Sequence, residues 1–335
     1  MRPSRLGAFA AVPLLAAVTA CTDPDPLGRR GFALSPSIVP VSDITASDMP
    51  RDGLPVLDDP FMLSAGDDAV EELLVPSDRV IGIELNGQAR AYPLRLMRWH
   101  ELANDTFGGV PIVVSYSPLA DAVTVATRAF ADVTLSFGAT GLLVDSVPLL
   151  YDRSTSPSLW HPLAGLAITG PRAGQRLELL PADLVTWGTW LELHPESEVL
   201  APVPALTRRY KRDPYHSYFG SDLLRFPVDP LPPGDGLALK DRVVVVTAPS
   251  GGIALALPHL ADSDRDRDGT VSVEAAGIPL TIDVTLAPAT ARVRRRDDGS
   301  PLPVRFSFWF AWYATERSVP SGSSPPEMTP EPTPP

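Results

Sequence analysis

Apolar and polar residues alternate along much of this chain, and a period of two residues is typical of strands with one buried face. Asn86-Gly87 separates two such runs and favours a two-residue hairpin turn, because both turn positions need a positive φ. The runs that predict strands are 79–86, 88–92, 110–116, 122–130, 133–137, 242–247, 252–257, 279–285 and 303–310. The pattern therefore predicts a β-rich fold.

Two short segments have a different spacing. Residues 94–103 carry apolar residues at helical intervals directly after Pro93, a residue that suits a first helical turn. We expect a helix there, with Asn104 and Asp105 around its end. Residues 187–193 fit either a short helix or a strand. The predicted fold class is α+β, rich in strands and with short helices.

Three pairs of motifs recur in the same order along the chain. Asp78-Arg79-Val80-Ile81 matches Asp241-Arg242-Val243-Val244, Gly109-Val110-Pro111-Ile112 matches Gly277-Ile278-Pro279-Leu280, and Trp187-Gly188-Thr189-Trp190 matches Trp309-Phe310-Ala311-Trp312. We therefore predict an internal duplication that produces two related β-rich lobes, of which the second is shorter.

The N-terminus predicts where the protein is located. Arg2 and Arg5 precede a short apolar stretch, and Val18-Thr19-Ala20-Cys21 resembles a bacterial lipobox, whose Cys receives a diacylglycerol. An ordinary secretory peptide with an incidental Cys is the alternative. The predicted segments are a signal peptide at 1–20, a lipidated flexible tether at 21–50, lobes at 51–204 and 205–317, and a disordered Pro-rich tail at 318–335. We expect the body to lie outside the cytoplasm in the bacterial cell envelope and to contact a membrane through the lipid on Cys21.

Composition excludes several classes of protein. Acidic residues number 40 against 28 basic ones, for a formal charge of −12, so the chain lacks the basic surface of a nucleic-acid binder. A single Cys excludes a disulfide framework and a thiolate metal cluster. After the N-terminus no apolar run is long enough for a membrane-spanning helix. No cofactor is expected.

Five separated segments resemble one protein family. They are NGQARAYPLRLMRWHELANDTFGGVPIVVSYSPL, GLLVDSVPLLYDRSTSPSLWHPLAGLAITGPRAGQRLELLP, TWGTWLELHP, DPYHSYFGSD and FWFAW. Together they resemble the uncharacterised prokaryotic family named domain of unknown function three-one-seven-nine, over roughly residues 53–316. The resemblance implies a β-rich extracytoplasmic domain, often found in lipoproteins, without an established activity.

This chain departs from the family pattern at one motif. The resemblance implies a Cys-Pro-Leu-Cys sequence where this chain has Ser117-Pro118-Leu119-Ala120. A close Cys pair indicates metal, haem or redox chemistry. Ser117 and Ala120 cannot perform that chemistry, so either the family role does not need the thiols or this member has lost it.

The first candidate site surrounds the end of the predicted helix. His100, Glu101, Asn104 and Asp105 could supply a general base oriented by a carboxylate, or part of a metal shell. The same residues also fit a C-terminal helix cap, in which His100 lies near the negative end of the helix. Both interpretations stay open.

The second candidate segment combines charge, hydroxyls and an indole. Asp152, Arg153, Thr155 and Trp160 lie within ten residues, and the planar fork of an Arg suits a carboxylate or a phosphate. The alternative is a turn held together by Asp152–Arg153 pairing. We expect this segment and the His100 segment to form two walls of one cleft.

Metal sites have weaker support in the sequence. Asp264, Asp266 and Asp268, followed by a Gly, resemble the first half of a calcium loop, but Glu274 falls at position eleven instead of twelve. A solvated acidic loop fits equally. His100, His161 and His194 do not share a short-spaced ligand motif. The cluster of Arg292, Arg294, Arg295 and Arg296 is the only basic patch, and we expect it to end a strand rather than to recruit an anion.

Three functions follow from these patterns. The leading hypothesis is a lipid-anchored, non-catalytic protein that binds an unidentified small molecule or protein. Its cleft in the first lobe would be lined by His100, Glu101, Asp105, Asp152, Arg153, Thr155 and Trp160. The alternative is an envelope hydrolase or transferase, with His100 as base and Arg153 stabilising negative charge. In the third, these residues only hold a scaffold together.

Overall fold

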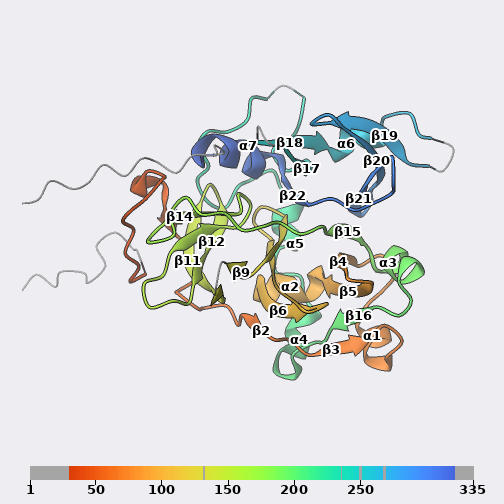
Figure 1. Ribbon diagram of the computed structural model, residues 1–335, viewed down its shortest axis with the longest axis horizontal. Helices are drawn as coiled ribbons and strands as arrows, with labels where there is room; N and C mark the ends of the chain where they lie inside the picture. Colours follow the sequence, from red (N-terminus) through yellow and green to blue (C-terminus); the bar gives the residue numbers. More distant parts are fainter. Residues whose placement is uncertain (1–29, 131–132, 235, 249–250, 267–268, 321–335) are drawn as a thin grey trace, which may run out of the picture.

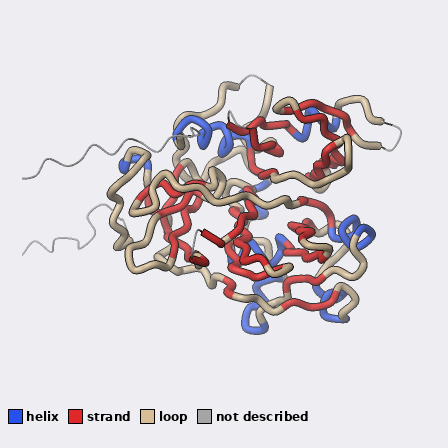
Figure 2. Tube along the Cα trace, in the orientation of Figure 1, coloured by secondary structure: helices blue, strands red, loops and turns tan. Residues whose placement is uncertain are grey.

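The computed structural model describes residues 30–130, 133–234, 236–248, 251–266 and 269–320 (Figure 1). Strands form most of the regular structure, and the helices are short (Figure 2). The β-rich α+β fold is therefore confirmed. Cys21 and the segment before it lie outside the described residues, as does most of the Pro-rich tail.

Two large sheets make up most of the fold. The seven-stranded sheet has the order β18 (Gly251–Ala256), β17 (Arg242–Ala248), β22 (Val304–Phe308), β8 (Ala122–Thr127), β7 (Val110–Ser117), β6 (Leu102–Phe107) and β2 (Leu57–Asp58). The eight-stranded sheet has the order β19 (Val271–Ala275), β20 (Ile278–Leu286), β21 (Ala289–Arg295), β15 (Asp183–Thr186), β4 (Arg79–Leu85), β5 (Gln88–Pro93), β16 (Glu198–Leu200) and β3 (Met62–Ser64).

A smaller sheet and short helices complete the structure. The five-stranded sheet has the order β1 (Thr45–Ala46), β11 (Phe137–Val144), β12 (Val147–Asp152), β13 (Leu159–His161) and β14 (Leu166–Thr169), and β9 (Ala129–Phe130) pairs with β10 (Val133–Thr134). The α-helices are α1 (Asp68–Leu73), α2 (Leu94–His100), α3 (Trp187–Leu193), α4 (Thr207–Tyr210), α5 (His216–Phe219), α6 (Leu257–Ala261) and α7 (Trp309–Ser318). Two 3-10 turns, η1 (Val41–Asp43) and η2 (Pro204–Leu206), lie in connecting segments.

The two large sheets pack face to face around the main core. Side-chain alternation produces this arrangement: Val244 and Val246 of β17 point into the core, whereas Val243 and Val245 pack on the opposite face with α7. Helices α2 and α6 add apolar residues to the same core. The five-stranded sheet covers the other face of β6, β7 and β8, where Trp160 lies in a separate apolar cluster.

Each large sheet carries a Trp-containing helix on its outer face. Trp190 of α3 lies against Gly82 of β4, where a Cβ would come within 2.2 Å of the indole. Trp312 of α7 lies in the same way against Gly252 of β18, at 2.3 Å. The absence of a side chain on each Gly therefore makes room for a buried indole.

Both halves of the predicted duplication contribute strands to both large sheets. Strands β4 and β5 belong to the eight-stranded sheet and β6 to β8 to the seven-stranded one, while β17 to β21 divide in the opposite way. The repeated motifs make equivalent contacts, since Trp187 N donates to Asp78 O and Trp309 N to Asp241 O, each at 2.7 Å. These contacts agree with the duplication, which stays a prediction. The boundary at residue 204 does not divide the chain into two separate sheets.

Three local predictions can be compared with the structure. The Asn86-Gly87 turn is confirmed, with φ of 53° and 75°. The helix expected over 94–103 ends at His100, because Glu101 adopts a left-handed conformation (φ 59°) and β6 begins directly after it. Asn104 and Asp105 therefore lie within β6, and the alternative that placed them in a turn capping the helix was wrong. Residues 187–193 form a helix.

The tether expected over residues 21–50 was also wrong in its second part. Phe32, Leu34, Val39 and Ile44 are buried in one apolar cluster with the five-stranded sheet. Strand β1 pairs with β11 in the same region. Residues 30–50 therefore belong to the folded body.

Candidate functional site

His100 is sealed within the protein. Its Nδ1 lies 2.6 Å from the carbonyl oxygen of Pro55, and its Nε2 lies 2.7 Å from the hydroxyl of Tyr210. A carbonyl only accepts, so Nδ1 donates and Nε2 accepts the Tyr210 proton. Burial lowers the pKa of His100, which stays neutral. Because both ring nitrogens are already bonded, His100 has no free position with which to act as a base.

Glu101 does reach a cavity. Its carboxylate lies beside a space of about 60 Å³ whose other walls are largely apolar and include Leu102, Leu119 and Leu149. The Tyr215 hydroxyl donates to Glu101 over 3.3 Å. Burial raises the pKa of Glu101 to about 7, and the single long hydrogen bond opposes this only in part. The cavity has room for a few waters but not for a larger ligand.

Asp105 is part of a buried ion network on β6. Arg90 Nη1 donates to its Oδ2 at 2.7 Å, and the Tyr92 hydroxyl donates to the same oxygen. Arg90 also pairs with Glu198 on the neighbouring strand. Asp105 is therefore occupied by internal partners.

The Asp152 segment is also closed. Asp152 accepts hydrogen bonds from Trp160 Nε1 at 2.8 Å, from the Ser158 backbone N–H and from the Ser154 hydroxyl. Trp160 is fully buried, with the edges of Phe130 and Phe137 against it. Neither face of this indole is open for a ligand to stack on.

The two predicted walls do lie next to each other. Asp58 on β2 accepts from Asn104 Nδ2 and from Arg153 Nη1, each at 2.7 Å. Arg153 is exposed and held by this ion pair, and Thr155 is exposed. Among the described residues no hydrogen bond joins His100 to Asp152, so the structure brings the segments together without directing these two side chains to a common point.

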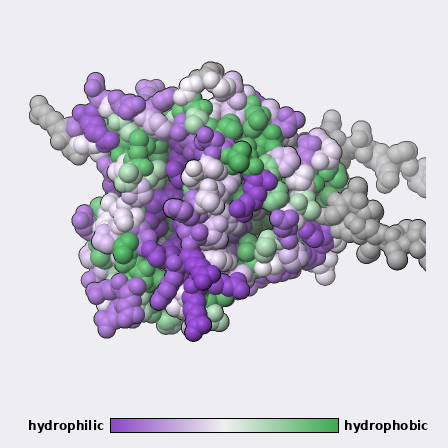
Figure 3. Space-filling model, turned by 180° about the vertical axis from the view of Figure 1, so that it is seen from behind, coloured by the Kyte–Doolittle hydropathy of each residue, from purple (hydrophilic) through white to green (hydrophobic). Residues whose placement is uncertain are grey.

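The face opposite to that of Figure 1 does not single out a binding surface. On the side opposite to that of Figure 1, hydrophobic residues form several separate patches among hydrophilic ones (Figure 3). Cavities are therefore the better guide to a ligand site.

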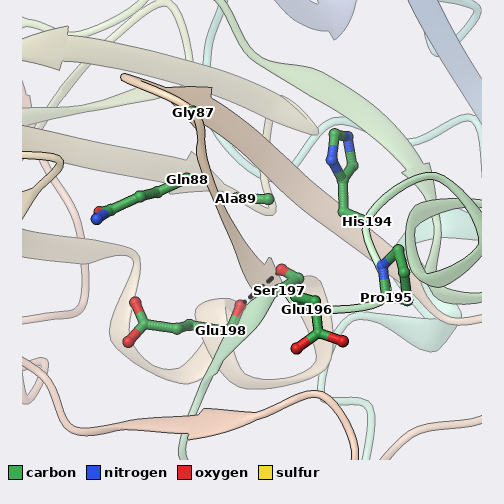
Figure 4. Close-up of a pocket in the computed structure, with 8 residues that line it drawn as sticks. All are labelled: Gly87, Gln88, Ala89, His194, Pro195, Glu196, Ser197 and Glu198. Carbon is green, nitrogen blue, oxygen red and sulfur yellow. Dashed lines mark hydrogen bonds between the residues drawn. The ribbon is translucent and has the colours of Figure 1, made fainter.

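One cavity lies between Gly87–Ala89 of the β4–β5 hairpin and residues 194–198, with a volume of about 400 Å³. Figure 4 shows that the side chains of His194, Glu196 and Glu198 point in different directions from its wall. Within the described residues, no group of three His, Cys, Asp or Glu side chains is arranged to hold a metal ion. These side chains do not converge on a common ligand position.

A second cavity, called the arginine cavity here, differs in charge because three Arg residues line it. It has a volume of about 360 Å³ and lies where the turn before β14 and residues 176–179 meet β17, β20, β21 and β22. Three Arg residues line it, and no described Asp or Glu does. The lining residues are Ala164, Gly165, Arg176, Leu177, Leu179, Thr247, Ile278, Arg295, Leu302, Pro303 and Arg305. The cavity is therefore positively charged.

Arg305 is the most deeply placed of the three Arg residues, with 6% of its surface exposed. Its Nη1 donates to Leu163 O at 2.7 Å and its guanidinium lies over Trp312, but its buried Nε makes no hydrogen bond. No described carboxylate pairs with it within 4.0 Å. Burial lowers the pKa of Arg305 to about 10, so it remains charged at neutral pH. A buried charge with an unused donor needs an acceptor to compensate it.

His161 provides a second unused donor near Arg305. Its Nδ1 accepts from the Ala164 N–H at 3.2 Å, which places the ring proton on Nε2, and that buried atom has no partner among the described residues. Burial and then the charge of Arg305 lower the pKa of His161 to about 3, so it is neutral. The region thus contains donors without matching acceptors.

Sequence reasoning did not identify the arginine cavity. Arg295 was expected to end a strand, and it does end β21, but its position on a cavity wall was not foreseen. A usable signal was Arg305, a charged residue inside the apolar run 303–310 and flanked by Val304 and Phe306. His161 and the Arg176 turn come together with it only in the folded chain.

The calcium motif can be followed only in part. Asp268 lies outside the described residues. Asp266 accepts from the Ser272 hydroxyl at 2.6 Å, and the Gly269 N–H donates to its backbone oxygen. The loop between α6 and β19 is thus closed by its own hydrogen bonds.

Comparison with known proteins identifies one family. The family described as "Protein of unknown function (DUF3179)" matches residues 51–318. Searches of curated proteins and of solved structures each found no match. Among the described residues, no helix is long and apolar enough to cross a membrane.

Proposed function

The chain belongs to the DUF3179 family, and from its cavities we propose that it is a non-catalytic protein that binds a small anion. The anion lies in the arginine cavity, close to Arg176, Arg295 and Arg305. The observation that carries the proposal is Arg305, a buried guanidinium that forms no ion pair with a described carboxylate and that lines a cavity without carboxylates. Guanidinium groups bind carboxylates and phosphates with charge-assisted hydrogen bonds.

The alternative of a hydrolase or transferase has less support. His100 would have to act as base, but both of its ring nitrogens are engaged by Pro55 and Tyr210. Arg153 would have to stabilise a developing charge, but it pairs with Asp58 at the surface. Asp105 and Asp152 are buried, and each is hydrogen-bonded to its own neighbours in the chain. This favours the scaffold role for the first lobe.

Isothermal titration with a panel of small anions tests the proposal. We expect at least one anion to bind the wild type, and Arg305→Met to weaken that binding at least tenfold. An Arg176→Gln, Arg295→Gln double variant changes two less buried residues and checks the result without altering a deeply buried position. Arg208→Gln, which changes an exposed Arg in α4, is the matched control. Binding that is unchanged in both cavity variants would overturn the proposal.

We further propose that the lipid on Cys21 holds this domain at a membrane of the cell envelope. The support is the lipobox pattern at residues 18–21 and the single Cys of the chain. Fractionation of cells that express a Cys21→Ser variant tests this. We expect the variant in the soluble fraction and the wild type with the membranes, and a variant that stays with the membranes contradicts the anchor.

A further inference from the structure

The arginine cavity carries more information than the sign of its ligand. We propose that it selects an organic dianion, with two anionic groups separated by a short apolar body, over inorganic oxyanions and over monoanions. This inference rests on the proposed anion-binding function and names the ligand class for the same site.

The three Arg residues lie at different depths. Arg305 is 6% exposed, Arg295 is half-buried, and Arg176 is exposed at the rim. Arg176 is fixed there, because its Nη2 donates to Pro320 O at 3.0 Å. A ligand with anionic groups at both ends can therefore reach the deep guanidinium and one nearer the opening at the same time.

The charge balance favours two negative charges. Glu316 of α7 is close enough to Arg305 to affect its ionisation, although the two do not form an ion pair. Three guanidinium groups and one nearby carboxylate leave about two positive charges at the cavity. Asp298, which is exposed, lies near Arg295, and neither it nor Glu316 lines the cavity. A monoanion would compensate only one of the two positive charges that remain when Glu316 is counted.

The walls between the Arg residues are apolar. Leu177, Leu179, Ile278, Leu302 and Pro303 line the cavity, and Thr247 also contributes to its lining. A volume of about 360 Å³ falls in the range of pockets that hold organic ligands. An inorganic oxyanion would leave most of this space, and all of the apolar wall, to water. A short methylene body would cover that wall.

The ligand chemistry has two possible sources, which are dicarboxylates and phosphate esters. Both offer oxygen acceptors to a guanidinium fork. The shared requirement is two negative charges on an organic body, and the experiment separates the two sources.

The test is isothermal titration of the mature protein with inorganic phosphate, butanoate, succinate, adipate and glycerol phosphate at fixed ionic strength. We expect succinate, adipate or glycerol phosphate to bind at least tenfold more tightly than phosphate and butanoate. The preferred member identifies the source. Arg176→Gln should weaken the binding of the preferred dianion by a larger factor than it weakens the binding of butanoate. Arg208→Gln is the control.

The outcomes separate the two proposals. Equal affinity for butanoate and the dicarboxylates, or tighter binding of inorganic phosphate, would overturn the dianion inference and leave the anion site in place. If no anion of the panel binds in a manner that depends on Arg305, the proposed function itself fails.

Discussion

Two Arg-containing sites of the molecule have opposite environments. At the first, Asp121 receives two hydrogen bonds from Arg79, at 2.8 and 2.9 Å, and one from Arg242, and it also accepts from the Tyr116 hydroxyl. At the second, Arg305 has no paired carboxylate among the described residues and lines a cavity. The carboxylate partner of the first site comes from the chain itself, whereas in our proposal an external anion supplies the partner of the second.

The difference shows how structural and functional charges can be told apart. In a closed network the donors and acceptors bond to one another, so the role of the network is to join segments of the fold. Arg79 and Arg242 open the two copies of the repeated motif, and Asp121 joins them. Unused donors beside open space indicate a ligand. By the same criterion, the internal hydrogen bonds of His100, Asp105 and Asp152 favour a scaffold role for these residues.

The largest expected effect comes from breaking the closed network. Asp121→Ala leaves the Arg79 side chain, 11% exposed, without its carboxylate. We expect a loss of about 3–5 kcal/mol in the free energy of unfolding, the usual cost of an unpaired buried charge. Urea denaturation measures this, with the exposed Asp48→Ala as control. A loss below about 1 kcal/mol would show that the network is not structural.

The Asp121 site also predicts a loss of stability at low pH. Burial opposes ionisation of Asp121, but Arg79 and Arg242 outweigh it and hold the pKa of that carboxyl well below its usual range. Because the folded-state pKa is depressed, the stabilisation is present above the unfolded pKa of about 4 and is lost as the pH falls below it. The Asp121→Ala variant should lack this part of the loss of stability at low pH.

Glu101 is an intermediate case, a buried carboxyl with one long hydrogen bond from Tyr215. Its pKa is raised from 4.5 to about 7 by burial, so the wild type should lose stability as the pH rises through this interval. Glu101→Gln removes the penalty. We expect the stability of the variant relative to wild type to increase by about 1–3 kcal/mol between pH 4 and pH 8.

Denaturation curves at the two pH values measure this difference, with the exposed Glu192→Gln as the matched control. If the difference between Glu101→Gln and wild type does not change with pH, the carboxyl is not held in an apolar environment.

Arg305→Met sharpens the comparison from the other side. Removing an unpaired buried charge in favour of an apolar side chain of similar length should change the free energy of unfolding by no more than about 1 kcal/mol. The variant should therefore fold and still lose anion binding. A destabilisation as large as that of Asp121→Ala would mean that Arg305 is structural after all.

The sequence predicted what depends on neighbours along the chain. The hairpin at Asn86-Gly87 and the strands on either side follow from local turn chemistry and alternation. The end of helix α2 was missed because Glu101, not a Gly, adopts the left-handed conformation. The sites depend on residues far apart in the sequence, such as His100 with Tyr210 and Arg305 with Leu163. No local pattern contains those contacts, so the sealed state of His100 and the arginine cavity could not be foreseen.

The smallest expected effect is the stabilisation of the acidic loop by calcium. The loop that contains Asp264, Asp266 and Asp268 stays a prediction for weak calcium binding. Sites of the extracellular type have dissociation constants of about 0.1–1 mM, so 1 mM calcium should stabilise the fold by roughly 0.4–1.4 kcal/mol. For a folded body of this size, this corresponds to a rise of about 1–2 °C in the melting midpoint.

Thermal melts with calcium, with magnesium and with a chelator check this prediction, and Asp266→Asn is the variant that should abolish the shift. Asp266 already accepts from Ser272, so a bound ion has to share that carboxylate or displace the hydroxyl, which keeps the expected affinity low. If the melting midpoint is the same in calcium and in chelator, the loop does not bind calcium. Its polar groups are then satisfied by hydrogen bonds within the chain. A shift that survives in Asp266→Asn would place any calcium elsewhere.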